Sequence, residues 1–293
     1  MPDKLRTTAF SDTSRKCRIT DGRNSRRRRM NRFGTPHKPA RVSAQRTMNA
    51  VTIEIAGIPA EIRCRYPENV RFFQDYATDK PPLFAVDATD EDIEQTRADY
   101  VRMDDARGWP QIKREDSFME NNALHALLAE ALLAHGVLLV HGSALCMDGQ
   151  AVIFSAKSGT GKSTHPRLWR EAFGDRVWMI NDDKPMLRLI DGKAYVYGTP
   201  WNGKHHLSTN AGAPLAAIVL LERDETNHVE PMSPADAYTM LLRHVYHFKS
   251  TGSAARVMDL ETQLLTAVRF YRLGCNMDPE AARVAYEGIL KGK

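Results

Sequence analysis

Two hydrophobic patterns follow one another along the chain and predict different structures. Between residues 51 and 86, apolar and polar residues alternate in short runs, at 51–55, 60–64 and 83–86, with glycine and proline between them. Alternation with a period of two, bounded by such residues, is typical of half-buried strands. This part of the sequence therefore predicts a small β-rich region.

Two helices are predicted next. Residues 87–103 are acidic and predicted to be helical. The helix is expected to begin near Thr89, whose hydroxyl is suited to cap it. After a loop-like segment that reaches about residue 116, apolar residues recur at helical spacing, at 124, 127, 128, 131 and 132. Ser117 is the predicted N-cap of this second helix, and Gly136 is its predicted end.

From residue 137 onward, short apolar runs alternate with helical stretches. The predicted strands are 137–140, 151–154, 177–180, 194–197, 216–221 and 268–273. The predicted helices follow Lys162 and cover 234–248, around 259–267, and 279–290. Strands mixed with helices in this way indicate an α/β fold, in which helices cover both faces of a sheet.

Composition divides the chain into three parts. Residues 1–47 carry fourteen Lys or Arg, three Asp and few apolar residues, which predicts a basic, disordered tail. Residues 48–116 form the β-rich region, and residues 117–293 form the larger α/β domain. Either the tail is a solvated part of the protein, or the start codon has been placed too far upstream and Met48 is the true first residue. An arm that binds nucleic acid or a membrane surface is not favoured.

The composition is that of an ordinary globular protein, with 42% hydrophobic and 26% charged residues in a chain of 293. Glu130 and His135 interrupt the richest apolar stretch, residues 127–140, which is too short to cross a bilayer. The four cysteines lie far apart without a Cys-x-x-Cys pair, so neither a structural zinc site nor a disulfide framework is indicated. We therefore expect a cytoplasmic protein without a membrane span.

The strongest motif lies between a predicted strand and a predicted helix, in residues 155–164, Ser-Ala-Lys-Ser-Gly-Thr-Gly-Lys-Ser-Thr. It departs from a Walker A loop only where Ala156 replaces the first glycine. The glycines let backbone N–H groups point at phosphate oxygens, while Lys162 would reach the β- and γ-phosphates and Ser163 would ligate Mg²⁺. The residues predicted to bind ATP are Ser158, Gly159, Thr160, Gly161, Lys162, Ser163 and Thr164.

Two acidic residues follow the predicted strand 177–180. Asp182 and Asp183 come directly after Asn181, at the end of the strand that we expect beside the phosphate loop. One carboxylate would bind Mg²⁺, directly or through water, and the other would accept the proton of a hydroxyl nucleophile. The residues alone leave open which of the two has which role.

Two further segments carry candidate catalytic groups. His141 ends the predicted strand 137–140, and the sequence leaves open whether it is structural or lies near the phosphates. Lys204 lies in the turn-rich segment 198–206, which we interpret as a lid or substrate loop. Its ammonium group would neutralise negative charge in a transition state.

The order of these motifs resembles that of a known family. His141-Gly142-Ser143, then the phosphate loop, then Asn181-Asp182-Asp183 is similar to the catalytic domain of HPr kinase/phosphorylase, whose fold is related to phosphoenolpyruvate carboxykinase. Small relatives of that kinase, including lasso-peptide kinases, are more similar still, through residues 198–204 and 221–223. The resemblance covers about residues 118–290 and implies a P-loop kinase core. It also implies that Asp182 is the general base, that Asp183 is a Mg²⁺ ligand and that His141 lies close to the phosphates.

The predicted function is an ATP- and Mg²⁺-dependent kinase whose acceptor is a serine of a peptide or protein, or a small hydroxyl compound. HPr itself is disfavoured, because no Glu-x-Arg-Gly-x-Gly segment follows the acidic pair. The alternative is a nucleotide-binding regulatory or scaffold protein of the same fold, without phosphotransfer. A carboxykinase is not favoured. HPr kinases form ring-shaped assemblies, so the resemblance leaves open whether this chain forms a homo-oligomer.

Overall fold

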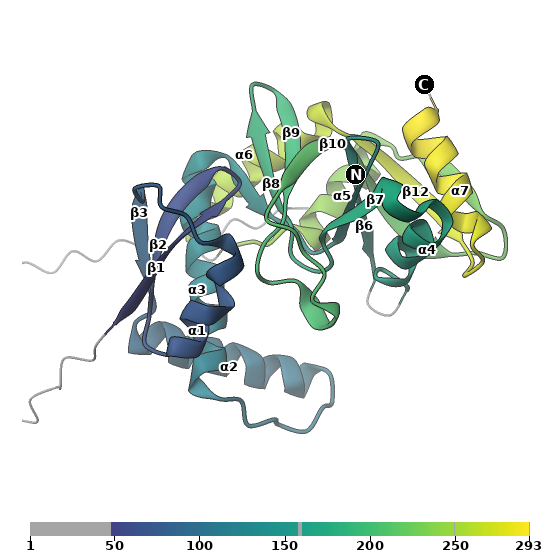
Figure 1. The fold of residues 1–293 in the computed structure, drawn as a ribbon. Helices are drawn as coiled ribbons and strands as arrows, with labels where there is room; N and C mark the ends of the chain where they lie inside the picture. Colours follow the sequence, from purple (N-terminus) through teal and green to yellow (C-terminus); the bar gives the residue numbers. More distant parts are fainter. Residues whose placement is uncertain (1–47, 158–159, 249, 293) are drawn as a thin grey trace, which may run out of the picture. The chain divides into compact units, whose positions relative to one another are not determined.

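Figure 1 shows the computed structural model of the chain, which describes residues 48–157, 160–248 and 250–292. These residues belong to one compact unit. The predicted basic tail lies outside the described residues, as do Ser158 and Gly159 of the phosphate loop. Within the described ranges, no helix combines the length and the apolar character that a membrane crossing requires.

The β-rich region is present where the alternating pattern predicts it. Strands β1 (Asn49–Ile55) and β2 (Ile58–Cys64) form an antiparallel hairpin, and β3 (Phe84–Asp87) pairs with β2 in parallel. A short helix that the pattern does not predict, α1 (Pro67–Phe72), lies between β2 and β3 and begins with a proline at its first turn. Proline is tolerated there because the first N–H groups of a helix have no intrahelical partner.

Helix α2 (Asp90–Ala106) begins at the predicted cap. The Thr89 hydroxyl accepts a hydrogen bond from the backbone N–H of Asp92 at 3.1 Å, and the Asp92 carboxylate accepts one from the backbone N–H of Thr89 at 2.8 Å. This reciprocal pair is a capping box, which satisfies two N–H groups near the start of the helix.

Replacing Thr89 by alanine removes half of this capping box. We expect the free energy of unfolding to fall by about 1 kcal/mol, the usual cost of losing a hydroxyl N-cap. Urea denaturation measures the change, and Thr89→Ser, which keeps a hydroxyl, is the matched control. A loss of the same size in the serine variant would mean that the methyl group, rather than the cap, stabilises this helix.

Helix α3 (Asp116–Leu132) carries the predicted apolar stripe, but its predicted N-cap is wrong. Ser117 lies inside the helix, and Glu115 is the N-cap residue, without a side-chain capping bond. Asp116 accepts a hydrogen bond from Arg97 of α2 at 2.6 Å, and this tertiary contact anchors the first turn without a hydroxyl cap. A 3₁₀ turn follows, and Gly136, at φ 73°, ends the segment as predicted.

The β-rich region and α3 share one hydrophobic core. Ile53, Ile55 and Ile62 of the hairpin belong to the same buried cluster as Leu124 and Leu128 of α3. The cluster also includes Trp201, from the segment interpreted as a lid or substrate loop. The β-rich region therefore packs against structure that leads directly to the predicted site.

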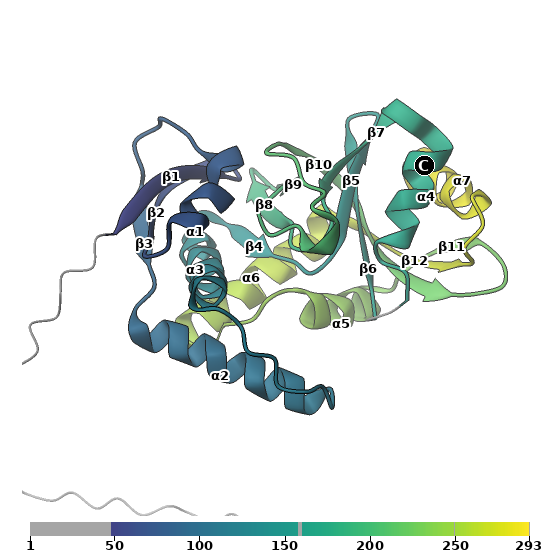
Figure 2. The same ribbon diagram turned by 60° about the horizontal axis from the view of Figure 1, so that its bottom comes forward.

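The α/β fold class is confirmed by a nine-stranded mixed sheet with helices on both faces (Figures 1 and 2). Most of its strands follow the order β4-β8-β9-β10-β6-β5-β7, and β12 pairs with β10 and β11 beside this path. The strands are β4 (Val137–Leu139), β5 (Ser143–Met147), β6 (Gln150–Ala156), β7 (Val177–Asn181), β8 (Met186–Ile190), β9 (Lys193–Tyr197), β10 (Gly212–Arg223), β11 (His228–Pro231) and β12 (Arg269–Cys275). Of these, the pattern does not predict β5, β8 and β11.

Alternate residues of the central strands face different helices. Ile153 of β6 belongs to the cluster that includes α5 (Pro234–His244) and α6 (Thr251–Ala267). Its neighbours Val152 and Phe154 belong to the cluster that includes α4 (Thr164–Phe173) and α7 (Glu280–Tyr286). This period of two places one apolar layer on each face of the sheet.

Two of the predicted helix boundaries need correction. Helix α5 ends at His244 rather than near residue 248, and α6 begins at Thr251 rather than near residue 259. Ser250 caps α6, because its side chain accepts a hydrogen bond from the backbone N–H of Ser253. The helix therefore begins at its hydroxyl cap, about two turns before the apolar residues on which the prediction is based.

Strand β10 determines where the phosphate loop lies. Its C-terminal half pairs in parallel with β6 on one side and with β12 on the other, with Leu221 opposite Ala156 and Leu273. The three strands therefore end at the same edge of the sheet, and the segment between β6 and α4 begins there. In open α/β sheets, ligands bind outside this carboxyl edge.

Candidate functional site

The described part of the phosphate loop turns tightly into helix α4. Gly161 has φ 115°, a conformation that side chains disfavour, and its carbonyl accepts hydrogen bonds from the backbone N–H groups of Thr164 and His165. Lys162 and Ser163 follow at the start of the helix, and Ser163 is its N-cap residue. The loop thus delivers an ammonium group and a hydroxyl to the positive end of a helix.

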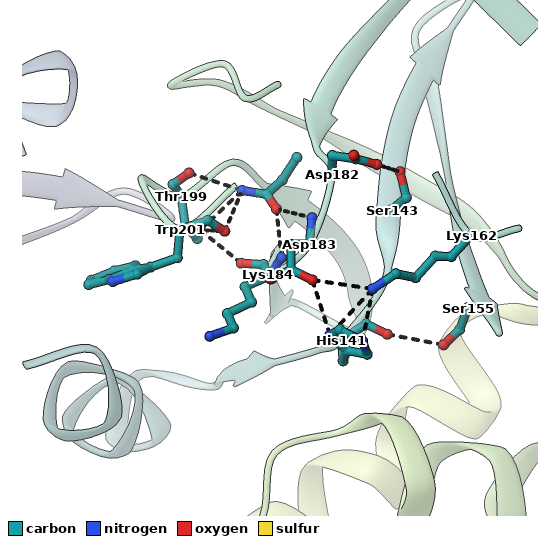
Figure 3. A network of polar contacts seen from close by, with 10 residues as sticks. His141, Ser143, Ser155, Lys162, Asp182, Asp183, Lys184, Thr199 and Trp201 are labelled. Atoms are coloured by element: carbon teal, nitrogen blue, oxygen red, sulfur yellow. Dashed lines mark hydrogen bonds and ion pairs between the residues drawn. The ribbon is translucent and has the colours of Figure 1, made fainter. Parts of the chain in front are cut away.

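Lys162, His141 and Asp183 contact one another, although they come from three separate segments (Figure 3). The Lys162 ammonium lies 2.8 Å from His141 Nε2 and 3.3 Å from Asp183 Oδ1. His141 Nδ1 lies 3.3 Å from the same carboxylate oxygen. The side chain of His141 is 56% exposed and that of Asp183 is 26% exposed, so the cluster is open to a ligand.

The backbone around His141 is held from two sides. The His141 N–H donates to the carbonyl of His244 at 2.7 Å, and the His141 carbonyl accepts from the Ser155 hydroxyl at 3.0 Å. Gly142 allows the chain to pass close to β6, because a Cβ atom at this position would lie 2.7 Å from Ile153 Cγ2. These contacts fix the β4–β5 connection beside the phosphate loop.

Asp182 has different surroundings from its neighbour. It is only 4% exposed, and its Oδ1 accepts a hydrogen bond of 2.6 Å from the buried hydroxyl of Ser143 in β5 (Figure 3). Its backbone N–H donates to the carbonyl of Leu207 at 3.0 Å. The two acids that are adjacent in the sequence therefore differ in the structure: Asp182 is buried and held by a hydroxyl, whereas Asp183 is partly exposed and paired with a cation.

Asn181 organises the turn that carries both acids. It is fully buried, and its side-chain oxygen accepts the backbone N–H groups of Asp183 and Lys184 at 2.8 and 2.7 Å. Its amide group donates to the carbonyl and the hydroxyl of Thr199, at 2.9 and 3.1 Å. One side chain thus fixes both the acidic turn and the segment leading to Trp201.

Burial governs protonation in this cluster. Burial lowers the pKa of Lys162, while the negative charge of Asp183 opposes the shift. Partial loss of hydration inside the site, and then the positive charge of Lys162, lower the pKa of His141, while the charge of Asp183 opposes the shift. At neutral pH the imidazole is therefore neutral, and it accepts a hydrogen bond from the ammonium group.

A cavity of about 300 Å³ is lined by His141, and two larger cavities lie beside Asp183 and the phosphate loop. One has a volume of about 460 Å³ and is lined by Asp183, by Trp201 and by side chains of α1, α2 and α3; we call it the α1–α3 cavity. The other has a volume of about 520 Å³ and lies at the ends of β10 and β12, beside Thr160 and Gly161; we call it the edge cavity. Open space therefore lies next to the phosphate loop and, separately, next to Asp183.

The remaining predicted residues lie near these cavities. Thr164 lines the edge cavity, and burial places the neighbouring His165 in a neutral state, with its pKa lowered to about 3. Lys204 is exposed in a 3₁₀ turn (Gly203–His205), directly after Gly203, which packs against Asp183. The structure thus brings Lys162, His141 and Asp183 into contact. Lys204 lies near the site because its neighbour in the loop, Gly203, packs against Asp183.

Several residues of the site are absent from the sequence-based prediction. Ser143, Asn181 and Trp201 all belong to motifs singled out there, but their side chains are not assigned roles. Asn181 carries a recognisable signal, because asparagine often accepts the N–H two residues later and so begins a turn. The Ser143–Asp182 bond had no such signal, since it joins β5 to the turn after β7, and the two residues are 39 positions apart in the sequence.

Comparison with known proteins gives little beyond this geometry. No protein-family model matches the sequence, and no curated protein matches it. Among solved structures, the chain is similar to the HPr(Ser) kinase/phosphatase from Coxiella burnetii, with 11% identity and a TM-score of 0.30. The match covers 52% of this chain and 91% of that one. A likeness this remote carries no argument about activity.

Proposed function

We propose that the chain is an ATP- and Mg²⁺-dependent kinase that transfers the γ-phosphoryl group to a hydroxyl, and that serine in a peptide or protein is the acceptor. The observation that carries this proposal is the contact of Lys162 with His141 and Asp183 at the end of a loop with a Walker A sequence. Phosphoryl transfer asks a protein mainly for positioning and for neutralisation of charge. A lysine, a neutral histidine and a carboxylate in contact supply both.

The nucleotide would lie along the carboxyl edge of the sheet. The backbone N–H groups of residues 160–164 and the ammonium of Lys162 would hold the phosphates, as the corresponding groups do in Walker A loops generally. The edge cavity continues from Thr160 and Gly161 toward Leu221 and Met277, and its volume of about 520 Å³ is sufficient for a nucleoside. This supports placing the base and the ribose there.

The residues present are suited to Mg²⁺ bound together with phosphates. Among the described residues, no cluster of three or more His, Cys, Asp or Glu could enclose a metal ion by itself. Mg²⁺ in kinases uses one or two carboxylates together with substrate phosphates and water, so Ser163 and one aspartate are an adequate protein share. The ion would supply charge for the transferred phosphoryl group.

Transfer needs one proton acceptor and one cation. The acceptor oxygen forms a bond to the γ-phosphorus while the bond from this phosphorus to the β–γ bridging oxygen breaks, and the electron pair stays on ADP. The hydroxyl proton passes to an aspartate carboxylate. Lys162 stabilises the negative charge on the phosphates during this step, and His141, neutral and in contact with it, keeps the ammonium in place.

The geometry supports giving the acceptor-side role to Asp183. Asp183 lines the α1–α3 cavity, from which a hydroxyl could approach, whereas Asp182 is buried against Ser143. We therefore propose that Asp183 accepts the proton and that Asp182 acts with Ser163 on the metal side. This reverses the assignment implied by the family resemblance. The phosphoenolpyruvate carboxykinase-like core remains part of the proposal, supported by the order of the motifs.

The function is tested with purified full-length chain, radiolabelled ATP and Mg²⁺. Acceptors are a panel of serine peptides, free serine and small alcohols, and ATP binding is measured in parallel by calorimetry. We expect ATP to bind and label to pass to at least one acceptor. ATP binding without any transfer would overturn the kinase proposal and favour a nucleotide-binding regulatory protein.

Gly203 provides a test of the position of Asp183. It has φ 69°, and a Cβ atom there would lie 3.0 Å from Asp183 Cβ. Gly203→Ala is therefore expected to lower kcat about tenfold or more by displacing the carboxylate, with little change in ATP affinity. The matched control is Gly192→Ala, since Gly192 has φ 73° and no heavy atom within 4 Å of the added carbon. An equal loss of kcat in both variants would show that backbone strain alone is responsible.

A further inference from the structure

The α1–α3 cavity is larger than the acceptor hydroxyl requires. Its volume of about 460 Å³ lies in the range of pockets that enclose an entire small ligand. Asp183 and Lys184 belong to its lining, and the other side chains come mainly from the three helices of the N-terminal part of the chain. Space next to these helices is therefore open to a molecule that reaches Asp183.

The amide side chains in the lining are already engaged with the protein. Asn121 accepts a hydrogen bond from the Trp201 indole N–H at 2.8 Å, and its amide group donates to Asn69. Asn122 accepts from the Tyr100 hydroxyl at 3.0 Å and donates to the carbonyl of Phe118 at 2.8 Å. These groups stabilise the walls of the cavity and are not available as the main means of recognising a ligand.

The exposed surface of the cavity includes two phenylalanine rings. Phe72 of α1 is 40% exposed and Phe118 of α3 is 42% exposed. Each is backed by another aromatic ring, Phe72 by Trp201 at 6.0 Å and Phe118 by Tyr100 at 5.4 Å between ring centroids. Backing of this kind holds a ring in place, so little conformational entropy is lost when a ligand packs against it.

We propose that this cavity binds the acceptor as a polypeptide segment, in which the hydroxyl residue is flanked by an aromatic or large aliphatic side chain that packs against Phe72 and Phe118. This inference rests on the proposed kinase function. Free serine and small alcohols have little apolar surface to bury against two rings on different helices, whereas a phenylalanine or leucine side chain is stabilised by burying its apolar surface there. The aromatic pairs thus determine specificity, and Asp183 acts on the hydroxyl.

The first test uses a peptide library with one central serine, ATP and Mg²⁺. We expect labelled products to be enriched in aromatic and large aliphatic residues next to the serine. For a selected peptide, Phe118→Ala is expected to raise KM about tenfold, while kcat and the Kd of ATP stay within about twofold. Trp109→Ala is the matched control, because Trp109 is an aromatic residue that is 50% exposed and does not line this cavity.

The second test measures binding without catalysis. A fluorescein-labelled Gly-Phe-Ala-Leu-Gly peptide, which has no hydroxyl to phosphorylate, is compared with Gly-Gly-Ala-Gly-Gly by fluorescence anisotropy. Tighter binding of the first peptide, weakened about tenfold by Phe118→Ala and unchanged by Trp109→Ala, would support the proposal. Equal binding of the two peptides, no binding of either, or no effect of Phe118→Ala would overturn it.

The two tests separate the two proposals. If the first peptide binds as expected but no acceptor is ever labelled, the kinase proposal fails and the cavity remains a peptide-binding site. If transfer occurs without preference for flanking residues, or free serine is as good an acceptor as the best peptide, the kinase stands and the peptide-binding cavity does not.

Discussion

Replacing Lys162 by alanine is expected to reduce phosphoryl transfer about 1000-fold or more and to weaken ATP binding. The ammonium lies 3.3 Å from Asp183 Oδ1 and 2.8 Å from His141 Nε2. Its removal leaves the phosphates without a fixed positive charge at the point where negative charge moves in the transition state. Initial rates with labelled ATP measure the first effect, and calorimetry measures the second.

The control for this variant lies at the other end of the same loop. Lys157 is exposed and follows β6 directly, so Lys157→Ala removes the same charge from the same loop without touching His141 or Asp183. We expect it to retain most of the activity. A large loss in Lys157→Ala, or near-normal transfer by Lys162→Ala, would contradict the role given to Lys162.

Much of the fold could be predicted because its signals are local. Apolar runs of four residues indicated β6 and β7, and the Thr89–Asp92 pair indicated the start of α2, since each signal depends on residues within a few positions of one another. The phosphate loop was recognisable for the same reason. Its chemistry depends on consecutive backbone N–H groups, so its sequence is contiguous.

The strands that were missed show where such signals are weak. In β5, Ser143–Met147, there is no β-branched residue, and every side chain is buried, so neither composition nor alternation distinguishes it. The turn signal was nevertheless present: Asp148-Gly149 and Asp191-Gly192 both have positive φ and close the hairpins β5–β6 and β8–β9. Asp-Gly between apolar runs is typical of a two-residue hairpin turn.

The candidate site was predictable only in part because its geometry depends on distant contacts. The motifs indicated which side chains carry chemistry, but the difference between Asp182 and Asp183 arises from Ser143, 39 residues before Asp182, and from Asn181, which ties the turn to Thr199. Similarly, the α1–α3 cavity forms because the β-rich region and Trp201 share a core. No spacing in the sequence encodes these pairings.

The second large effect is expected from the two acids, and the paired variants should differ in kind. Asp183→Asn removes the proposed proton acceptor while keeping the shape of the side chain, so we expect kcat to fall by about 10²–10⁴-fold with ATP affinity nearly unchanged. Asp182→Asn should chiefly raise the Mg²⁺ concentration required for half-maximal rate, by about 10–100-fold, because an amide is a weaker Mg²⁺ partner than a carboxylate. Steady-state rates over a series of Mg²⁺ concentrations measure both.

Ser143→Ala separates the charge of Asp182 from its anchoring. This variant keeps the carboxylate but removes the hydroxyl that donates to it at 2.6 Å, so its Mg²⁺ dependence should lie between those of the wild type and Asp182→Asn. If Asp182→Asn instead abolished transfer at saturating Mg²⁺ while Asp183→Asn shifted only the metal requirement, the roles would be those implied by the family resemblance. In that case the acceptor would have to reach a carboxylate that is now only 4% exposed, which requires movement of the turn held by Asn181.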